Sequence, residues 1–135
     1  MQKYRNRISG PLLDRIDLHV EVPRLSFEEM NGARGEGSRF VRERVLDTRN
    51  IQLHRNNALN SRLTLQQTGE VCVLDRQDRL LLQQAIEKLQ LSARTYHRIL
   101  KLARTIADMD ASERIATRHL AEAINLRCLD RHGGK

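Results

Sequence analysis

The chain has 135 residues, of which 39% are hydrophobic and only 3% aromatic, and it contains no tryptophan. This length fits one domain, and a core limited to Leu, Ile, Val and Ala favours packed helices over an all-β fold. The 24 Lys and Arg residues outnumber the 17 Asp and Glu residues, and the resulting net charge of +7 indicates a polyanionic partner such as nucleotide, nucleic acid or a membrane surface.

The cysteines and the N-terminal sequence bear on the compartment. Cys72 and Cys128 are far apart, which supports neither a disulfide framework nor a CxxC metal site. The first residues, MQKYRNR, lack the apolar region of a secretory signal, and no apolar run approaches the roughly 20 residues that cross a bilayer. We therefore expect a soluble, cytoplasmic protein without a membrane partner.

Residues 1–30 combine a predicted helix with a predicted strand. Ser9 and Gly10 ahead of Pro11 suit a short helix with proline in its first turn. In DLHVEV, residues 17–22, apolar and polar residues alternate as in a half-buried strand. One strand cannot stand alone, so either another strand is hidden in this chain or the segment belongs to a larger domain.

The glycine-rich residues 31–37 are expected to form a linker to a helical region over 38–129. The first helix is predicted over 38–57 with Ser38 as its N-cap, amphipathic but only partly buried. Its apolar side comprises Val41, Val45 and Leu46.

Four further periodic segments follow, and residues 130–135 are expected to be a disordered tail. The predicted helices are 64–71, 75–90 capped by Asp75, 92–109 capped by Ser92, and 117–129 capped by Thr117. Their expected core residues are Leu82, Ala85, Ile86, Leu89, Tyr96, Ile99, Leu100, Ala103, Ala107, Leu120, Ala123 and Ile124, whereas Arg94, Arg98, Lys101 and Arg104 lie on the flanks of 92–109.

The sequence contains no complete phosphate-binding loop. GARGEG, residues 32–37, supplies glycines but no following Lys and Ser or Thr, and a linker explains it better. No two histidines are spaced i and i+4, and no HExxH motif or acidic cluster is present, so we expect no metal site. The chain is therefore not expected to hydrolyse a nucleotide by itself.

Two arginines are candidates for phosphate binding. Arg15 lies between the apolar Leu12 and Leu13 and the DLHV segment, so local packing would hold its position. Arg94 falls in the first turn of the helix capped by Ser92, where the helix dipole favours an anion. From spacing alone, each is better explained as a surface arginine or a salt-bridge partner than as a phosphate ligand.

Two longer motifs resemble a known family. ISGPLLDRIDLHVEVP, residues 8–23, and LSARTYHRILKLARTIADMDASERIATRHLAEAI, residues 91–124, are similar to the C-terminal part of magnesium-chelatase-like AAA+ ATPases. The resemblance covers residues 4–127 and is closest to the competence-associated ComM/YifB subgroup. It implies a mainly α fold, a helical AAA+ lid of about four helices, preceded by a helix-strand remnant of an α/β core.

The resemblance also implies roles. Arg15 takes the position of an arginine finger acting in trans, and Arg94, in the Ser-Ala-Arg sequence 92–94, takes that of the sensor 2 arginine contacting ATP phosphate. Full-length proteins of this kind use ATP and Mg²⁺ in homo-oligomeric rings, and some are thought to act on DNA. The nucleotide-binding core would lie upstream, so the fragment should not bind ATP tightly, and residues 17–22 should be poorly ordered without their sheet.

Two other functions remain open. The basic helices 38–57 and 92–109 fit a nucleic-acid-binding module, although no zinc finger or aromatic stacking platform accompanies them. A bundle that serves only as a protein-interaction domain is the third possibility.

Overall fold

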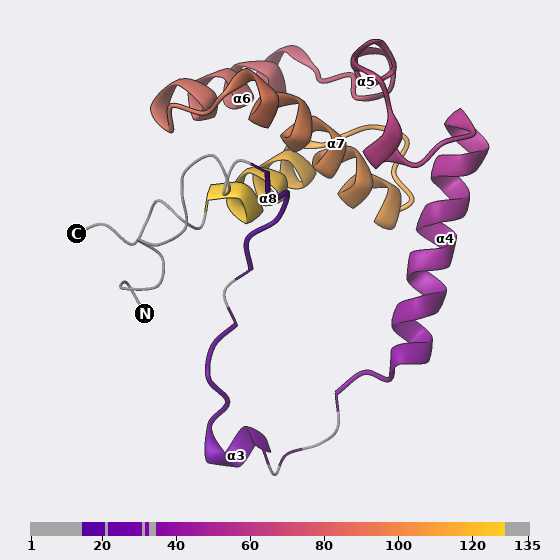
Figure 1. Cartoon of the computed structure of the whole chain (residues 1–135), viewed down its shortest axis with the longest axis vertical. Coiled ribbons are helices and arrows are strands. Elements are labelled where there is room, and N and C mark those ends of the chain that lie inside the picture. The colour runs from indigo at the N-terminus through magenta and orange to yellow at the C-terminus, as the bar shows by residue number, and fades with distance from the viewer. Residues whose placement is uncertain (1–14, 21, 31, 33–34, 129–135) are drawn as a thin grey trace.

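The computed structural model describes residues 15–20, 22–30, 32 and 35–128, and these are mainly helical. A short helix α3 (Phe27–Met30) precedes the long helix α4 (Ser38–Asn56). A 3₁₀ turn η1 (Asn60–Arg62) then leads to the bundle, which consists of α5 (Leu65–Val71), α6 (Arg76–Lys88), α7 (Ala93–Met109) and α8 (Thr117–Cys128) (Figure 1). The predicted mainly α fold class is confirmed.

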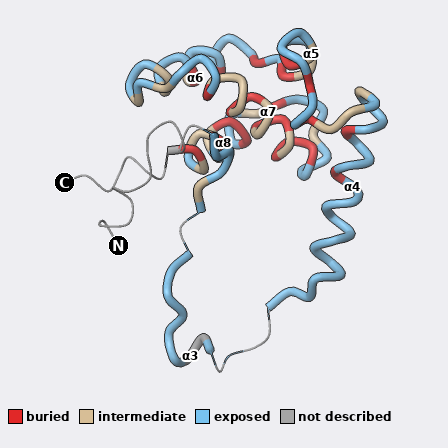
Figure 2. Tube along the Cα trace, viewed as in Figure 1, coloured by how far each residue is buried: buried red, intermediate tan, exposed pale blue. Residues whose placement is uncertain are grey.

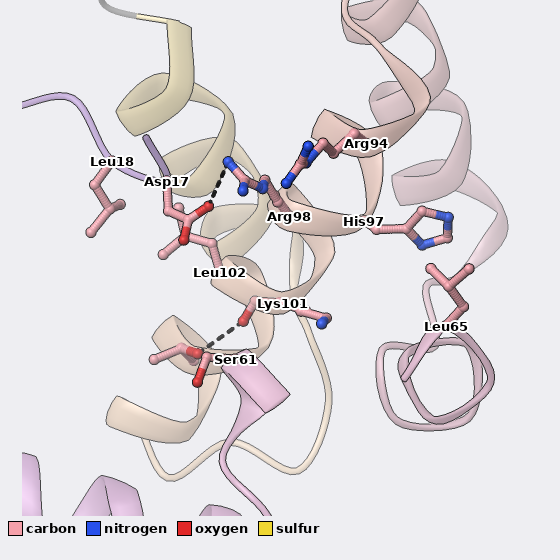
Figure 3. Close-up of a pocket in the computed structure, with 10 residues that line it drawn as sticks. Asp17, Leu18, Ser61, Leu65, Arg94, His97, Arg98, Lys101 and Leu102 are labelled. Atoms are coloured by element: carbon pink, nitrogen blue, oxygen red, sulfur yellow. Dashed lines mark hydrogen bonds and ion pairs between the residues drawn. The ribbon is translucent and has the colours of Figure 1, made fainter. Parts of the chain in front are cut away.

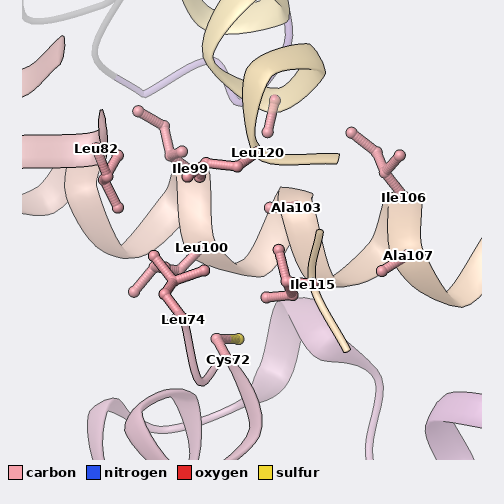
Figure 4. Packing of buried hydrophobic residues seen from close by; sticks show 11 residues of the cluster. Cys72, Leu74, Leu82, Ile99, Leu100, Ala103, Ile106, Ala107, Ile115 and Leu120 are labelled. Atoms are coloured by element: carbon pink, nitrogen blue, oxygen red, sulfur yellow. The ribbon is translucent and has the colours of Figure 1, made fainter. Parts of the chain in front are cut away.

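Helix α7 is the centre of the bundle. It packs most extensively on α8, and it also contacts α4, α5 and η1. Its positions 99, 103 and 107 recur every four residues and are fully or almost fully buried, as the predicted stripe requires. Leu82 from α6 and Leu120 from α8 complete this core with no exposed surface (Figure 4). Burying one such leucine stabilises the fold by about 1.5–3 kcal/mol.

Two of the four predicted caps, Asp75 and Ser92, are confirmed. The Asp75 carboxylate accepts from the Asp78 N–H (2.7 Å), and the Ser92 hydroxyl accepts from the Thr95 N–H (3.3 Å). Thr64 adds a capping box at α5. These bonds satisfy backbone donors that a helix start leaves open.

Ser38 and Thr117 do not precede their helices as predicted; each is the first helical residue. Gly37 occupies the N-cap position of α4 without a side-chain bond. At α8, the His119 ring takes over part of the capping, because its Nδ1 accepts the Ala116 N–H at 3.0 Å.

Helix α4 projects from the bundle and touches it near its C-terminal end (Figures 1 and 2). Its buried residues are Thr48 and Gln52, both polar. The predicted apolar residues Val41, Val45 and Leu46 are instead more than 40% exposed. The prediction of partial burial holds, but the side predicted to be buried is wrong, because polar contacts near the helix end determine how α4 is seated.

The strand predicted over residues 17–22 is wrong for this structure. Its described residues are irregular, and no strand occurs within the described part of the chain, so nothing supplies the ladder bonds that a strand needs. The predicted helix before it lies mainly outside the described residues. Residues 22–27 are exposed, and the described part of this segment runs from beside α8 to α3, away from the bundle (Figure 1). None of the helices in the described residues has the length and apolar character to cross a membrane.

Candidate functional site

A groove of about 420 Å³ runs along one side of α7 (Figure 3). Its walls come from α7, η1, the start of α5 and the irregular segment before α3. It is lined by Asp17, Leu18, Ser61, Leu65, Arg94, His97, Arg98, Lys101, Leu102 and Thr105. The groove therefore joins parts of the chain that are up to 88 positions apart in sequence, since it is lined by both residue 17 and residue 105.

Three cations of α7 line this groove. Arg94, Arg98 and Lys101 are spaced i, i+4 and i+7, so one helix face presents all three. The Arg98 guanidinium pairs with the Asp17 carboxylate at 3.0 Å, and the Lys101 ammonium donates to the Leu63 carbonyl at 2.6 Å. Arg94 is exposed in the first turn of α7, and no carboxylate within the described residues pairs with it.

The position of Arg94 favours an anion for two physical reasons. Its helix begins one residue earlier, so the N–H groups and dipole of α7 add positive potential there. Lys101 on the same face contributes further positive charge, whereas the charge of Arg98 is offset by Asp17. The structure thus gathers Arg94 with two cations that the sequence had placed only on helix flanks.

Arg15 lies in a turn two residues before Asp17 and is exposed. It is not among the residues that line the groove. The structure therefore does not bring Arg15 and Arg94 to one site within this chain.

A second polar cluster is buried where α4 meets α7. The Asp108 side chain is fully buried and accepts two bonds from the Arg55 guanidinium, at 2.6 and 2.9 Å. It also accepts from the Asn60 amide at 2.8 Å and from the Arg104 Nε at 3.0 Å. Burial raises the pKa of Asp108, but the bonds from Arg55 and Asn60 and the charge of Arg104 outweigh it, so the pKa lies below its ordinary value.

Arg104 is part of this cluster and is only 2% exposed. Its remaining N–H groups donate to the backbone carbonyls of Ser112 and Glu113 in the connection between α7 and α8. The sequence placed Arg104 only on a flank of the 92–109 helix, and the structure shows that this residue is buried. Arg104 links the Asp108 carboxylate to the connection between α7 and α8, and Arg55 links the same carboxylate to α4.

Comparison with known proteins locates this architecture in a family. The model of the magnesium chelatase subunit ChlI C-terminal region matches residues 35–127, which include α4 to α8 and are more than half of the chain. A model of the magnesium chelatase subunit ChlI matches residues 1–30. The chain belongs to the magnesium chelatase ChlI family.

The chain is similar to several bacterial proteins. It is 45% identical over 133 residues to the competence protein ComM of Haemophilus influenzae, covering 97% of this chain. It is 40% identical over 131 residues to the uncharacterized protein YifB of Escherichia coli, and 31% identical over 132 residues to an uncharacterized protein of Mycobacterium tuberculosis. The chain spans 26% of the length of each of these relatives.

The predicted resemblance to this family is confirmed, and the matched regions contain both candidate arginines. Arg15 falls within the part matched by the ChlI model, and Arg94 within the part matched by its C-terminal model. The sequence did not predict the ion pair between Asp17 and Arg98. The only signal available for it was the opposite charge of the two residues, which many other pairs share.

Proposed function

We propose that this chain is the C-terminal lid and sensor region of a cytoplasmic magnesium-chelatase-like AAA+ ATPase. Arg94 would contact the phosphates of ATP bound to the upstream core of the same polypeptide. Arg15 would reach the nucleotide of the neighbouring subunit in a homo-oligomeric ring. The observation that carries this proposal is Arg94 itself, exposed in the first turn of α7 with two more cations along the same groove.

The lining of the groove suits phosphate better than a metal ion. Asp17 is the one carboxylate among its lining residues, and Arg98 already neutralises it. Mg²⁺ prefers carboxylates and phosphate oxygens, so upstream residues and ATP itself would hold it. When bound, ATP and Mg²⁺ supply the transferable phosphoryl group and its charge neutralisation. Arg94 then orients the phosphates, and Arg15 stabilises negative charge that develops during transfer.

The test replaces each arginine in the full-length protein and measures ATP turnover. We expect Arg15→Ala to lower kcat by about a thousandfold, as for other arginine fingers, and Arg94→Ala by about a hundredfold. Arg39→Ala is a matched control, because that side chain is 85% exposed on α4, outside the groove. Unchanged turnover in both test variants would overturn the proposal.

A nucleic-acid-binding role is the second candidate, and α4 carries the observation that favours it. Arg42 and Arg49 are exposed on this projecting helix. Arg39 and Arg44, however, pair with Glu43 and Glu36, at 3.0 and 2.8 Å, which reduces the charge available to phosphates. Titration with duplex DNA should show affinity falling steeply between about 50 and 200 mM salt if this role is correct. Affinity that does not change with salt would exclude it.

A further inference from the structure

Residues 17–19 attach the segment that carries Arg15 to the bundle. The Asp17 carboxylate pairs with Arg98 on α7, and the Leu18 side chain lines the same groove. The His19 N–H donates to the Leu126 carbonyl of α8 at 2.8 Å. Beyond this attachment, residues 22–27 are exposed. Three consecutive residues therefore dock the segment on α7 and α8.

This attachment lies close to both candidate arginines along the chain. Arg15 precedes Asp17 by two residues, a chain length of about 7 Å at most. Arg94 precedes Arg98 by four residues, which is about one turn of α7 and places them on the same face (Figure 3). The Asp17–Arg98 pair is thus the point at which the segment with Arg15 meets the helix with Arg94.

The two partners differ in exposure in a way that suits a releasable contact. The Arg98 side chain is 21% exposed and is held by its helix, whereas the Asp17 side chain is 71% exposed. Water competes for Asp17, so the pair contributes only a modest interaction. A modest interaction is enough to bias the position of a short segment without locking it.

We propose that Asp17 and Arg98 are positioning residues that couple Arg94 to Arg15. A shift of the first turns of α7, when Arg94 engages phosphate, moves Arg98 and with it the segment that carries Arg15. The occupancy of one nucleotide site would thereby set the placement of the arginine that serves the neighbouring site. This inference rests on the proposed function and adds to it a route between the two arginines.

The test is a set of mutant cycles on ATP turnover by the full-length protein. The effects of Arg15→Ala and Arg94→Ala are first measured singly and together. Coupling makes the double variant differ from the product of the single effects by about three- to fivefold, the factor that an ion pair of this exposure supplies. We expect that factor to fall to about one when the same cycle is repeated with Asp17→Asn or Arg98→Gln.

Conservative and surface variants separate coupling from a general structural effect. Asp17→Glu and Arg98→Lys keep the charges and should retain most of the coupling factor. Glu43→Gln removes the exposed pair with Arg39 on α4 and should leave the factor unchanged. In the 135-residue chain, Asp17→Asn should also speed hydrogen exchange of the His19 amide by severalfold, because the docked segment is released.

Three outcomes are distinguishable. If neither arginine variant slows turnover, the proposed function itself fails. If both slow turnover and their coupling persists after Asp17→Asn and Arg98→Gln, the proposed function stands and the coupling route is wrong. If coupling is lost in these variants and kept in Asp17→Glu and Glu43→Gln, the route is supported.

Discussion

The carboxylate of Asp108 is predicted to be the most sensitive polar group in the structure. It is fully buried and accepts four hydrogen bonds, two from Arg55 and one each from Asn60 and Arg104. Asp108→Ala removes both acceptor oxygens and with them all four hydrogen bonds. It leaves the Arg104 guanidinium, whose side chain is 3% exposed, buried without its carboxylate.

The expected loss of stability depends on which hydrogen bonds Arg104 and Arg55 can still make without Asp108. Breaking a buried ion pair by removing one partner costs about 3–5 kcal/mol. Arg104 keeps its bonds to two backbone carbonyls, and Arg55, whose side chain is 28% exposed, can turn to water. We therefore expect the lower end, about 3 kcal/mol, a large share of the 5–15 kcal/mol by which typical domains are stable.

Urea unfolding followed by circular dichroism measures this loss. With a slope of about 1–2 kcal/mol per molar urea, the midpoint should fall by roughly 2 M without a change in slope. Arg39→Ala is the control and should change the free energy of unfolding by less than about 0.5 kcal/mol, because its ion pair is exposed. An Asp108→Ala variant as stable as this control would refute the role assigned to the cluster.

Three further predictions concern the same bundle. Arg55→Ala should destabilise by about 1–2 kcal/mol, less than Asp108→Ala in the same urea assay, because Arg104 and Asn60 still bind the carboxylate. The lowered pKa of Asp108 means that the unfolded chain takes up its proton first as pH falls. Its stabilisation is therefore fully present above about pH 5 and is lost progressively as the pH falls through the ordinary aspartate range toward the lowered pKa, and the acid-induced fall in the urea midpoint should shrink in Asp108→Ala. Burial raises the pKa of the Cys72 thiol from 9.0 to about 11. In a Cys128→Ser background, iodoacetamide at pH 8 should thus label Cys72 about a hundredfold more slowly than an unfolded thiol, and native-state labelling at the unfolded rate would contradict this burial.

Local patterns were enough to predict the helical core. Leu82, Ile99 and Leu120 could be placed inside because apolar periodicity over a full helix has few competing explanations. Asp75 and Ser92 were correctly predicted as caps, because a side-chain acceptor just before a periodic segment acts locally.

Polar contacts between segments that are distant in sequence could not be predicted from local patterns. Arg104 and Asp108 are spaced i and i+4, which is typical of a solvated surface pair. Their burial depends on the approach of Arg55 and Asn60 and of the connection between α7 and α8. The pairing of Asp17 with Arg98 likewise depends on how the irregular segment lies on α7. For the candidate site, the sequence pointed to Arg94 but not to the cations and the carboxylate that surround it.

The side of α4 that packs on the bundle could not be predicted from the sequence either. Its apolar residues predicted a buried side, yet Thr48 and Gln52 are the residues that lie against the bundle. The Gln52 side chain accepts the Asn60 N–H at 3.0 Å, next to the Asp108 cluster. A polar contact therefore determines which side of α4 is buried, and hydrophobic periodicity carries no signal for it.

Mixing two inactive variants of the full-length protein tests the central claim most directly. On our account a nucleotide site needs Arg94 from the subunit that holds the nucleotide and Arg15 from its neighbour. Rings of Arg15→Ala alone or Arg94→Ala alone therefore contain no complete site. In an equal, randomly assembled mixture, about a quarter of the head-to-tail interfaces join an intact Arg94 to an intact Arg15. We predict that ATP turnover of the mixture rises toward about a quarter of the rate of the unmodified protein. Turnover of the mixture that stays at the average of the two separate variants would contradict the account.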